Sequence, residues 1–168
     1  MTLTFPEIVV PQCLRDHHPD LVKHLSDVSR VLAPDGVFMM MIPDKRFCFD
    51  HFIPESSIAD VLDARGRSVH SLRSVIEHLT MTTHNDALSY WRGDAGPAPD
   101  PMVRLPEALE KFAEAGGNYL DVHAWQFTPR SFASLISILQ RLGISTLRPD
   151  KVYATPLGRH EFAAVLRK

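Results

Sequence analysis

Apolar positions in the first third of the chain form two successive patterns. Between Asp20 and Leu32 they recur every three or four residues, which predicts an amphipathic helix with Asp20 as its N-cap. A Pro-Asp-Gly turn follows, and residues 37–42 are then apolar without polar alternation. Such a run is typical of a parallel strand covered on both faces. A shorter apolar run at residues 7–10 predicts another strand.

The remaining pattern predicts a helical insertion and a pair of closing strands. Residues 55–115 show helical periodicity, interrupted by a proline- and glycine-rich loop over 93–106. The strands at 144–153 and 161–166 are joined by a short turn, so we expect them to be antiparallel. The expected helices span residues 56–65, 72–81, 106–115 and 129–142. The pattern therefore indicates an α/β fold with a mixed sheet.

Composition and charge narrow the classes of partner. The 168 residues fit one domain, and a net charge of -2 gives no electrostatic reason to expect nucleic acid or an anionic membrane surface. No apolar run approaches the roughly 20 residues that span a bilayer. The two cysteines suggest no disulfide framework, and the amino terminus does not resemble a signal peptide. We expect a cytoplasmic protein without nucleic-acid or membrane partners.

Three motifs in order resemble a known family. They are Val31-Leu-Ala-Pro-Asp-Gly36, Pro43-Asp-Lys-Arg-Phe-Cys-Phe-Asp50 and Tyr119-Leu-Asp-Val-His-Ala-Trp-Gln-Phe-Thr-Pro129. Together they resemble class I S-adenosylmethionine-dependent methyltransferases, and the second motif is similar to a bacterial subgroup. The resemblance covers nearly the whole chain and implies the second half of a Rossmann-like sheet, with strands in the order 7–10, 37–42, 161–166, 144–153. It also implies methyl transfer to an oxygen or nitrogen of a small molecule or glycan precursor.

The chain departs from this family at the methyl-donor site. Family members begin with a strand and a glycine-rich loop that approaches the donor, and none of the eight glycines here lies in such a unit. We therefore expect residues 1–168 to be one N-terminally truncated domain with an incomplete donor site. By the resemblance, Gln12 and Cys13 are assigned to S-adenosylmethionine binding. The open edge of strand 7–10 is expected to pair with a second copy or a split-enzyme partner.

Polar residues directly after the strand at 37–42 are candidates for substrate binding. Asp44 could orient substrate or donor, and Arg46 could hold an anionic substrate through a bidentate fork. Asp50 closes the motif and is assigned to the same substrate site. The alternative interpretation is an ion-pair cluster that only fixes the loop.

His123 is the leading candidate for a general base, because methyl transfer to oxygen or nitrogen requires removal of an acceptor proton. Asp121 would orient it if the segment is extended, since residues two apart then share a face. The alternative is a structural histidine beside Trp125. His78, His84 and Trp125 are assigned to the acceptor pocket.

Two other functional classes stay open. The histidine spacing matches no zinc motif, so no metal ligand is predicted. A metal-dependent hydrolase using Asp44, His78, His84 and His123 is nevertheless a weaker alternative. The stronger alternative is a non-catalytic interaction module, or pseudoenzyme half, that lends its open strand edge to a partner.

Overall fold

A computed structural model describes residues 4–10 and 17–168 of the chain. Its four strands form one open sheet in the order β1-β2-β4-β3. β1 and β2 are parallel, and the other neighbours are antiparallel. The strands are β1 (Phe5–Val10), β2 (Leu32–Pro43), β3 (Arg148–Val152) and β4 (Glu161–Arg167). Strand order and directions confirm the predicted mixed α/β sheet.

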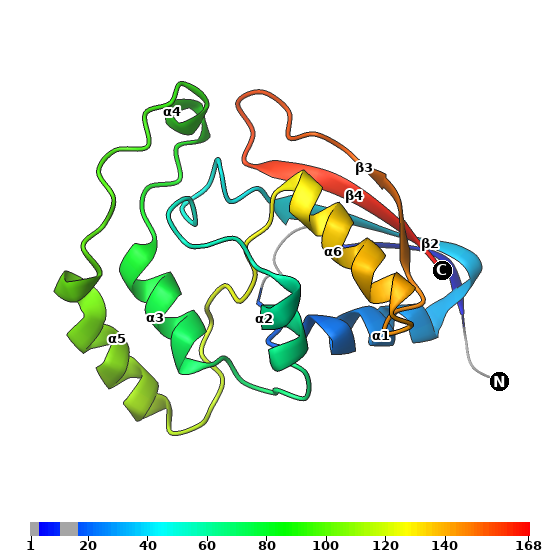
Figure 1. Ribbon diagram of the computed structural model, residues 1–168, viewed down its shortest axis with the longest axis horizontal. Helices are drawn as coiled ribbons and strands as arrows, with labels where there is room; N and C mark the ends of the chain where they lie inside the picture. The colour runs from blue at the N-terminus through cyan, green and yellow to red at the C-terminus, as the bar shows by residue number, and fades with distance from the viewer. Residues whose placement is uncertain (1–3, 11–16) are drawn as a thin grey trace.

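The described residues form six helices beside the sheet, and four of them, α2 to α5, lie in the insertion over residues 55–115 (Figure 1). α3 and α5 run side by side at a distance from the sheet, as Figure 1 shows. The helices are α1 (Leu21–Val31), α2 (Ile58–Asp63), α3 (Leu72–Met81), α4 (Ala87–Trp91), α5 (Pro101–Ala115) and α6 (Pro129–Arg141). None of the helices in the described ranges is long and apolar enough to cross a membrane.

Asp20 fixes the start of α1, as predicted. Its carboxylate accepts a hydrogen bond of 2.8 Å from the Lys23 N–H, which satisfies one of the donors left open in a first helical turn. The same carboxylate accepts a 2.6 Å hydrogen bond from the Gly66 N–H after α2. Asp20 therefore both caps the helix and attaches the insertion to it.

The sheet is buried on one face only, contrary to the prediction for residues 37–42. Alternate β2 side chains (Phe38, Met40 and Ile42) are buried in one core with α1 and α6. The intervening Met39 is half-buried, and Met41 is 38% exposed. An apolar run does not specify what covers each face, because that depends on packing elements distant in the sequence.

The insertion also differs from the pattern-based prediction. α5 begins at Pro101, five residues before the expected start, and Asp100 caps it by accepting a hydrogen bond from the Met102 N–H. Proline is well tolerated at the first helical position, so Pro101 begins the helix here instead of interrupting it. α4 was not predicted; Asp86 caps its single short turn.

Candidate functional site

Two loops meet where β2 ends. The segment before α6 lies beside the residues that follow β2: Asp44 and Phe127 form an isolated parallel bridge, and the Lys45 N–H donates to the Phe127 carbonyl over 2.9 Å. Farther along, the Thr83 N–H donates to the Phe49 carbonyl over 3.1 Å, which attaches the end of α3. These main-chain bonds bring the loop after β2, the segment before α6 and α3 to one place at the carboxyl end of β2.

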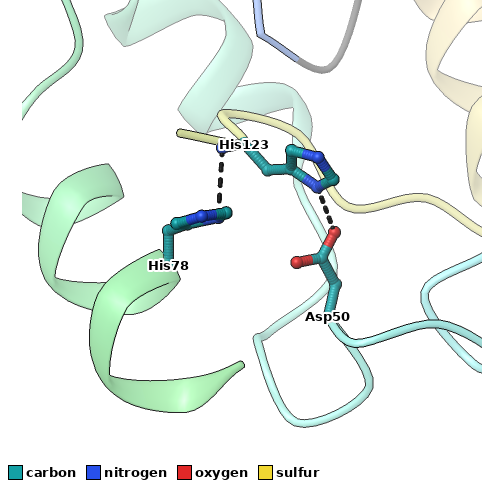
Figure 2. A group of neighbouring side chains, drawn as sticks. All are labelled: Asp50, His78 and His123. Carbon is teal, nitrogen blue, oxygen red and sulfur yellow. Dashed lines mark hydrogen bonds and ion pairs between the residues drawn. The ribbon is translucent and has the colours of Figure 1, made fainter. Parts of the chain in front are cut away.

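Asp50, His78 and His123 form the cluster at this meeting point (Figure 2). One donor atom from each side chain lies within 4.8 Å of the other two. Nδ1 of His123 is 2.7 Å from Oδ2 of Asp50, and the main-chain N–H of His123 donates to Nδ1 of His78 over 3.2 Å. The three side chains therefore lie close together, with the His123 ring directed toward Asp50 and its main chain toward His78 (Figure 2).

The Asp50–His123 pair is removed from water. Asp50 is 1% exposed and His123 is 7% exposed. A carboxylate accepts hydrogen bonds, so Nδ1 of His123 is the donor in this contact and the neutral ring carries its lone pair on Nε2. This is the tautomer and orientation that a carboxylate imposes on a histidine acting as a general base.

The second carboxylate oxygen of Asp50 is unusual. Oδ1 is buried and has no hydrogen-bond partner among the described residues. Figure 2 shows it directed to the side on which His78 lies. Buried polar groups normally have partners because an unpaired one loses its hydration without compensation. An unpaired oxygen in a cluster of ligand-type side chains is a sign of function.

Asp121, the predicted orienter of His123, contacts a different histidine. Its side chain is 77% exposed, and Oδ1 lies 2.7 Å from Nδ1 of His17. The His17 ring in turn lies edge-on against His123, with ring centroids 4.6 Å apart. The predicted common face required an extended strand, but residues 119–126 have no regular secondary structure. The carboxylate that contacts the His123 ring is instead that of Asp50, 73 residues away in the sequence.

His78 is a neutral member of the cluster. Burial lowers its pKa to about 4, and the neighbouring His123 adds to this effect. Nδ1 accepts the His123 N–H, so the neutral ring carries its proton on Nε2. His78 therefore lies near His123, as predicted, and it projects from the last turn of helix α3.

The Asp44–Arg46 pair supports the alternative interpretation of the Pro-Asp-Lys-Arg motif. The Asp44 carboxylate is fully buried and accepts bonds from the Arg46 main chain, from Nε at 2.9 Å and from a terminal nitrogen at 2.6 Å. The Thr155 hydroxyl also donates to it. This hydrogen bonding raises the pKa of Arg46. The guanidinium fork is engaged by Asp44 within the loop, and the Thr155 hydroxyl ties Asp44 to the segment before β4.

Other predicted site residues lie outside the cluster. The His84 ring stacks on Tyr90, away from any metal-type group found among the described residues. Trp125 is buried, and its indole N–H donates to the His18 carbonyl over 2.8 Å. Asp44 and His84 do not join His78 and His123 as the hydrolase alternative required. Gln12 and Cys13 lie outside the described residues.

A cavity of about 470 Å³ lies next to the cluster. Its wall includes His17, whose ring touches His123, as well as Tyr119, Lys23 and Arg67. This volume falls in the range of small-molecule sites, about 300–1,000 Å³. The cavity therefore gives a small molecule a place one side chain away from His123.

In comparisons with known proteins, no family model, curated protein or solved structure matches the chain.

Proposed function

We propose that this chain supplies the acceptor side of a methyltransferase-like centre, in which His123 removes a proton from an oxygen or nitrogen of a small molecule or glycan precursor. The observation that carries the proposal is the buried 2.7 Å contact between Asp50 and His123 at the carboxyl end of β2. Ligands of open α/β sheets bind outside the carboxyl ends of the strands. The mixed sheet is compatible with a partial Rossmann-like fold, and the motif resemblance supplies the reaction class.

The residues described here do not form a donor cradle. A close backbone approach to a nucleotide needs glycine. At Gly36, however, an added Cβ would meet the Ala33 carbonyl at 2.8 Å, so this glycine is required by the chain's own turn near the start of β2. The other glycines have positive φ, which turns require, and no main-chain neighbour closer than 3.9 Å to an added Cβ. The donor of this proposal is S-adenosylmethionine, which supplies an electrophilic methyl group, and its expected contacts remain Gln12 and Cys13.

The proton transfer is carried by this chain's own side chains. An acceptor bound within hydrogen-bonding reach of His123 would give its proton to Nε2 and keep the electron pair for the new bond to carbon. Nδ1 of the resulting imidazolium keeps its hydrogen bond to Asp50, whose negative charge stabilises the cation in a site with little water. The neutral His78 adds no opposing charge at pH 7.

Calorimetric titration with S-adenosylmethionine and with its demethylated product tests the proposal. Because this chain carries only part of the donor site, we expect weak but saturable, submillimolar binding of both compounds, and weaker binding in Gln12→Ala. His123→Asn is the matched control, because the proposed base acts on the acceptor and its loss should leave donor affinity unchanged. Binding that is absent or only millimolar would contradict the methyltransferase assignment.

A non-catalytic interaction module is the second candidate, favoured by the strand edge. β1 pairs with β2 on one side and with no other described strand, and Phe5 at its start is 49% exposed. Unpaired strand edges are templates for pairing with another chain. Sedimentation analysis checks this function: it predicts self-association or a stable complex through β1, whereas a monomer at all concentrations, with no partner bound, argues against it.

A further inference from the structure

We infer that Asp50, His78 and His123 bind a divalent first-row transition-metal ion, with Zn²⁺ as the best match. Two imidazoles and one carboxylate are the ligand set of many catalytic zinc sites and of facial-triad iron sites. One donor atom of each side chain already lies within 4.8 Å of the others. The inference does not depend on methyl transfer.

The distances require only a small adjustment. Ligands at 2.0–2.1 Å from a tetrahedral ion lie about 3.3 Å from one another. The Asp50–His123 contact, at 2.7 Å, is already tighter than this. Asp50 and His123 must therefore separate slightly, and His78, which projects from α3 toward them (Figure 2), must move closer from its place within 4.8 Å.

The ion would complete a site that is incomplete in hydrogen bonds. Oδ1 of Asp50 is buried without a partner and would gain one. Nδ1 of His78 accepts the main-chain N–H of His123 and therefore carries a lone pair. The bond that now uses this lone pair is 3.2 Å long, at the upper limit for a hydrogen bond, so an ion displaces a weak competitor.

Binding of the ion has a defined proton balance. If the ion takes Nδ1 of His123, the proton now on that atom leaves and the neutral ring is protonated on Nε2 instead. No net proton is released from a neutral ring, and the Nε2 lone pair is lost. An ion at this site therefore blocks proton acceptance by His123, so that Zn²⁺ would act as an inhibitor of the proposed base.

Zinc titration of the chelator-treated full chain tests the inference. We expect one ion per chain, and we expect His78→Gln and Asp50→Asn to weaken binding by about tenfold or more. His84→Gln is the matched control, because that ring stacks on Tyr90 outside the cluster and its loss should leave the affinity unchanged. Co²⁺ substitution gives an independent readout, since its visible absorption reports nitrogen and oxygen ligation.

Each result decides the question. The absence of saturable binding overturns the inference, and so does binding that is equal in the original chain and both cluster variants, which would place the ion on surface histidines. If Asp50→Asn does not fold, His78→Gln decides alone, with circular dichroism to verify its fold. Failure here leaves the proposed base intact, because that proposal rests on the Asp50–His123 contact, is tested by donor binding and needs no metal.

Discussion

Asp44 and Asp50 are both buried carboxylates in the loop after β2, but their surroundings differ. Both oxygens of Asp44 have partners, from Arg46 and Thr155. Asp50 has one partner, His123, and its other oxygen has none among the described residues. A fully paired buried carboxylate stabilises the fold, whereas a half-paired one costs stability and is retained where function needs it. The comparison assigns structure to Asp44 and chemistry to Asp50.

Asp44→Ala should have the largest effect on stability. It removes the acceptor of four hydrogen bonds and leaves the buried Thr155 hydroxyl unpaired. We expect the free energy of unfolding to fall by about 3 kcal/mol, measured by urea denaturation. Asp121→Ala is the control, because this exposed carboxylate should cost less than about 1 kcal/mol. Equal losses in the two variants would contradict the structural role of Asp44.

Acidification should destabilise the protein through His78. Its pKa is 6.5 when unfolded and about 4 when folded, so below pH 6.5 the unfolded chain binds a proton that the folded chain does not. Stability is unaffected above pH 6.5 and is lost as the pH falls toward 4. Allowing for partial solvent screening, we expect a loss of about 1–2 kcal/mol at pH 5.

Denaturant unfolding at pH 7 and pH 5, with chelator present, checks this effect. His78→Gln should reduce the difference between the two pH values. A difference that is unchanged in this variant would show that other groups, such as the buried His70, whose pKa is also lowered by burial, control the acid response.

Thr155→Val should have a smaller effect than Asp44→Ala. It removes one hydrogen bond to Asp44 and keeps both bonds from the Arg46 side chain. We expect a loss of about 1 kcal/mol in the free energy of unfolding. A loss as large as that of Asp44→Ala would mean that the buried hydroxyl, rather than the guanidinium, anchors the loop.

Asp50→Asn should have the smallest effect on stability. The amide oxygen can still accept the bond from His123, and the variant no longer buries a charge. We expect a change within about 1 kcal/mol in either direction, measured in the same urea series. The comparison between the two aspartates fails if Asp50→Asn destabilises the protein as much as Asp44→Ala does.

The strand order of the sheet could be predicted from the sequence, whereas the burial of its faces and the start of α5 could not. The helix at 72–81 and the strand order follow from local periodicity, short connections and the motif resemblance, and the structure has both. Burial on one face of β2 could not be read from residues 37–42, because an apolar run looks the same whether one or two faces are covered. The start of α5 was missed because Pro101 was taken as a loop residue rather than as a first helical position.

The three cluster residues are among the predicted site residues, but the contact between Asp50 and His123 was not predicted. His123, His78 and Asp50 were all singled out, but the sequence offered Asp121 as the partner of His123 because it lies two residues away. The true contact spans 73 residues and depends on the main-chain bonds that attach the segment before α6 to the loop after β2. Local spacing contains no information about such a long-range contact.

The central claim is that the Asp50 carboxylate fixes His123 with its proton on Nδ1 and its lone pair on Nε2. Nitrogen-15 NMR of the histidine rings at pH 7, without metal, reads this tautomer directly. We predict a neutral His123 protonated on Nδ1, and a shift toward the other tautomer when Asp50 is replaced by alanine. A lone pair on Nδ1 of His123 in the original chain would contradict the account.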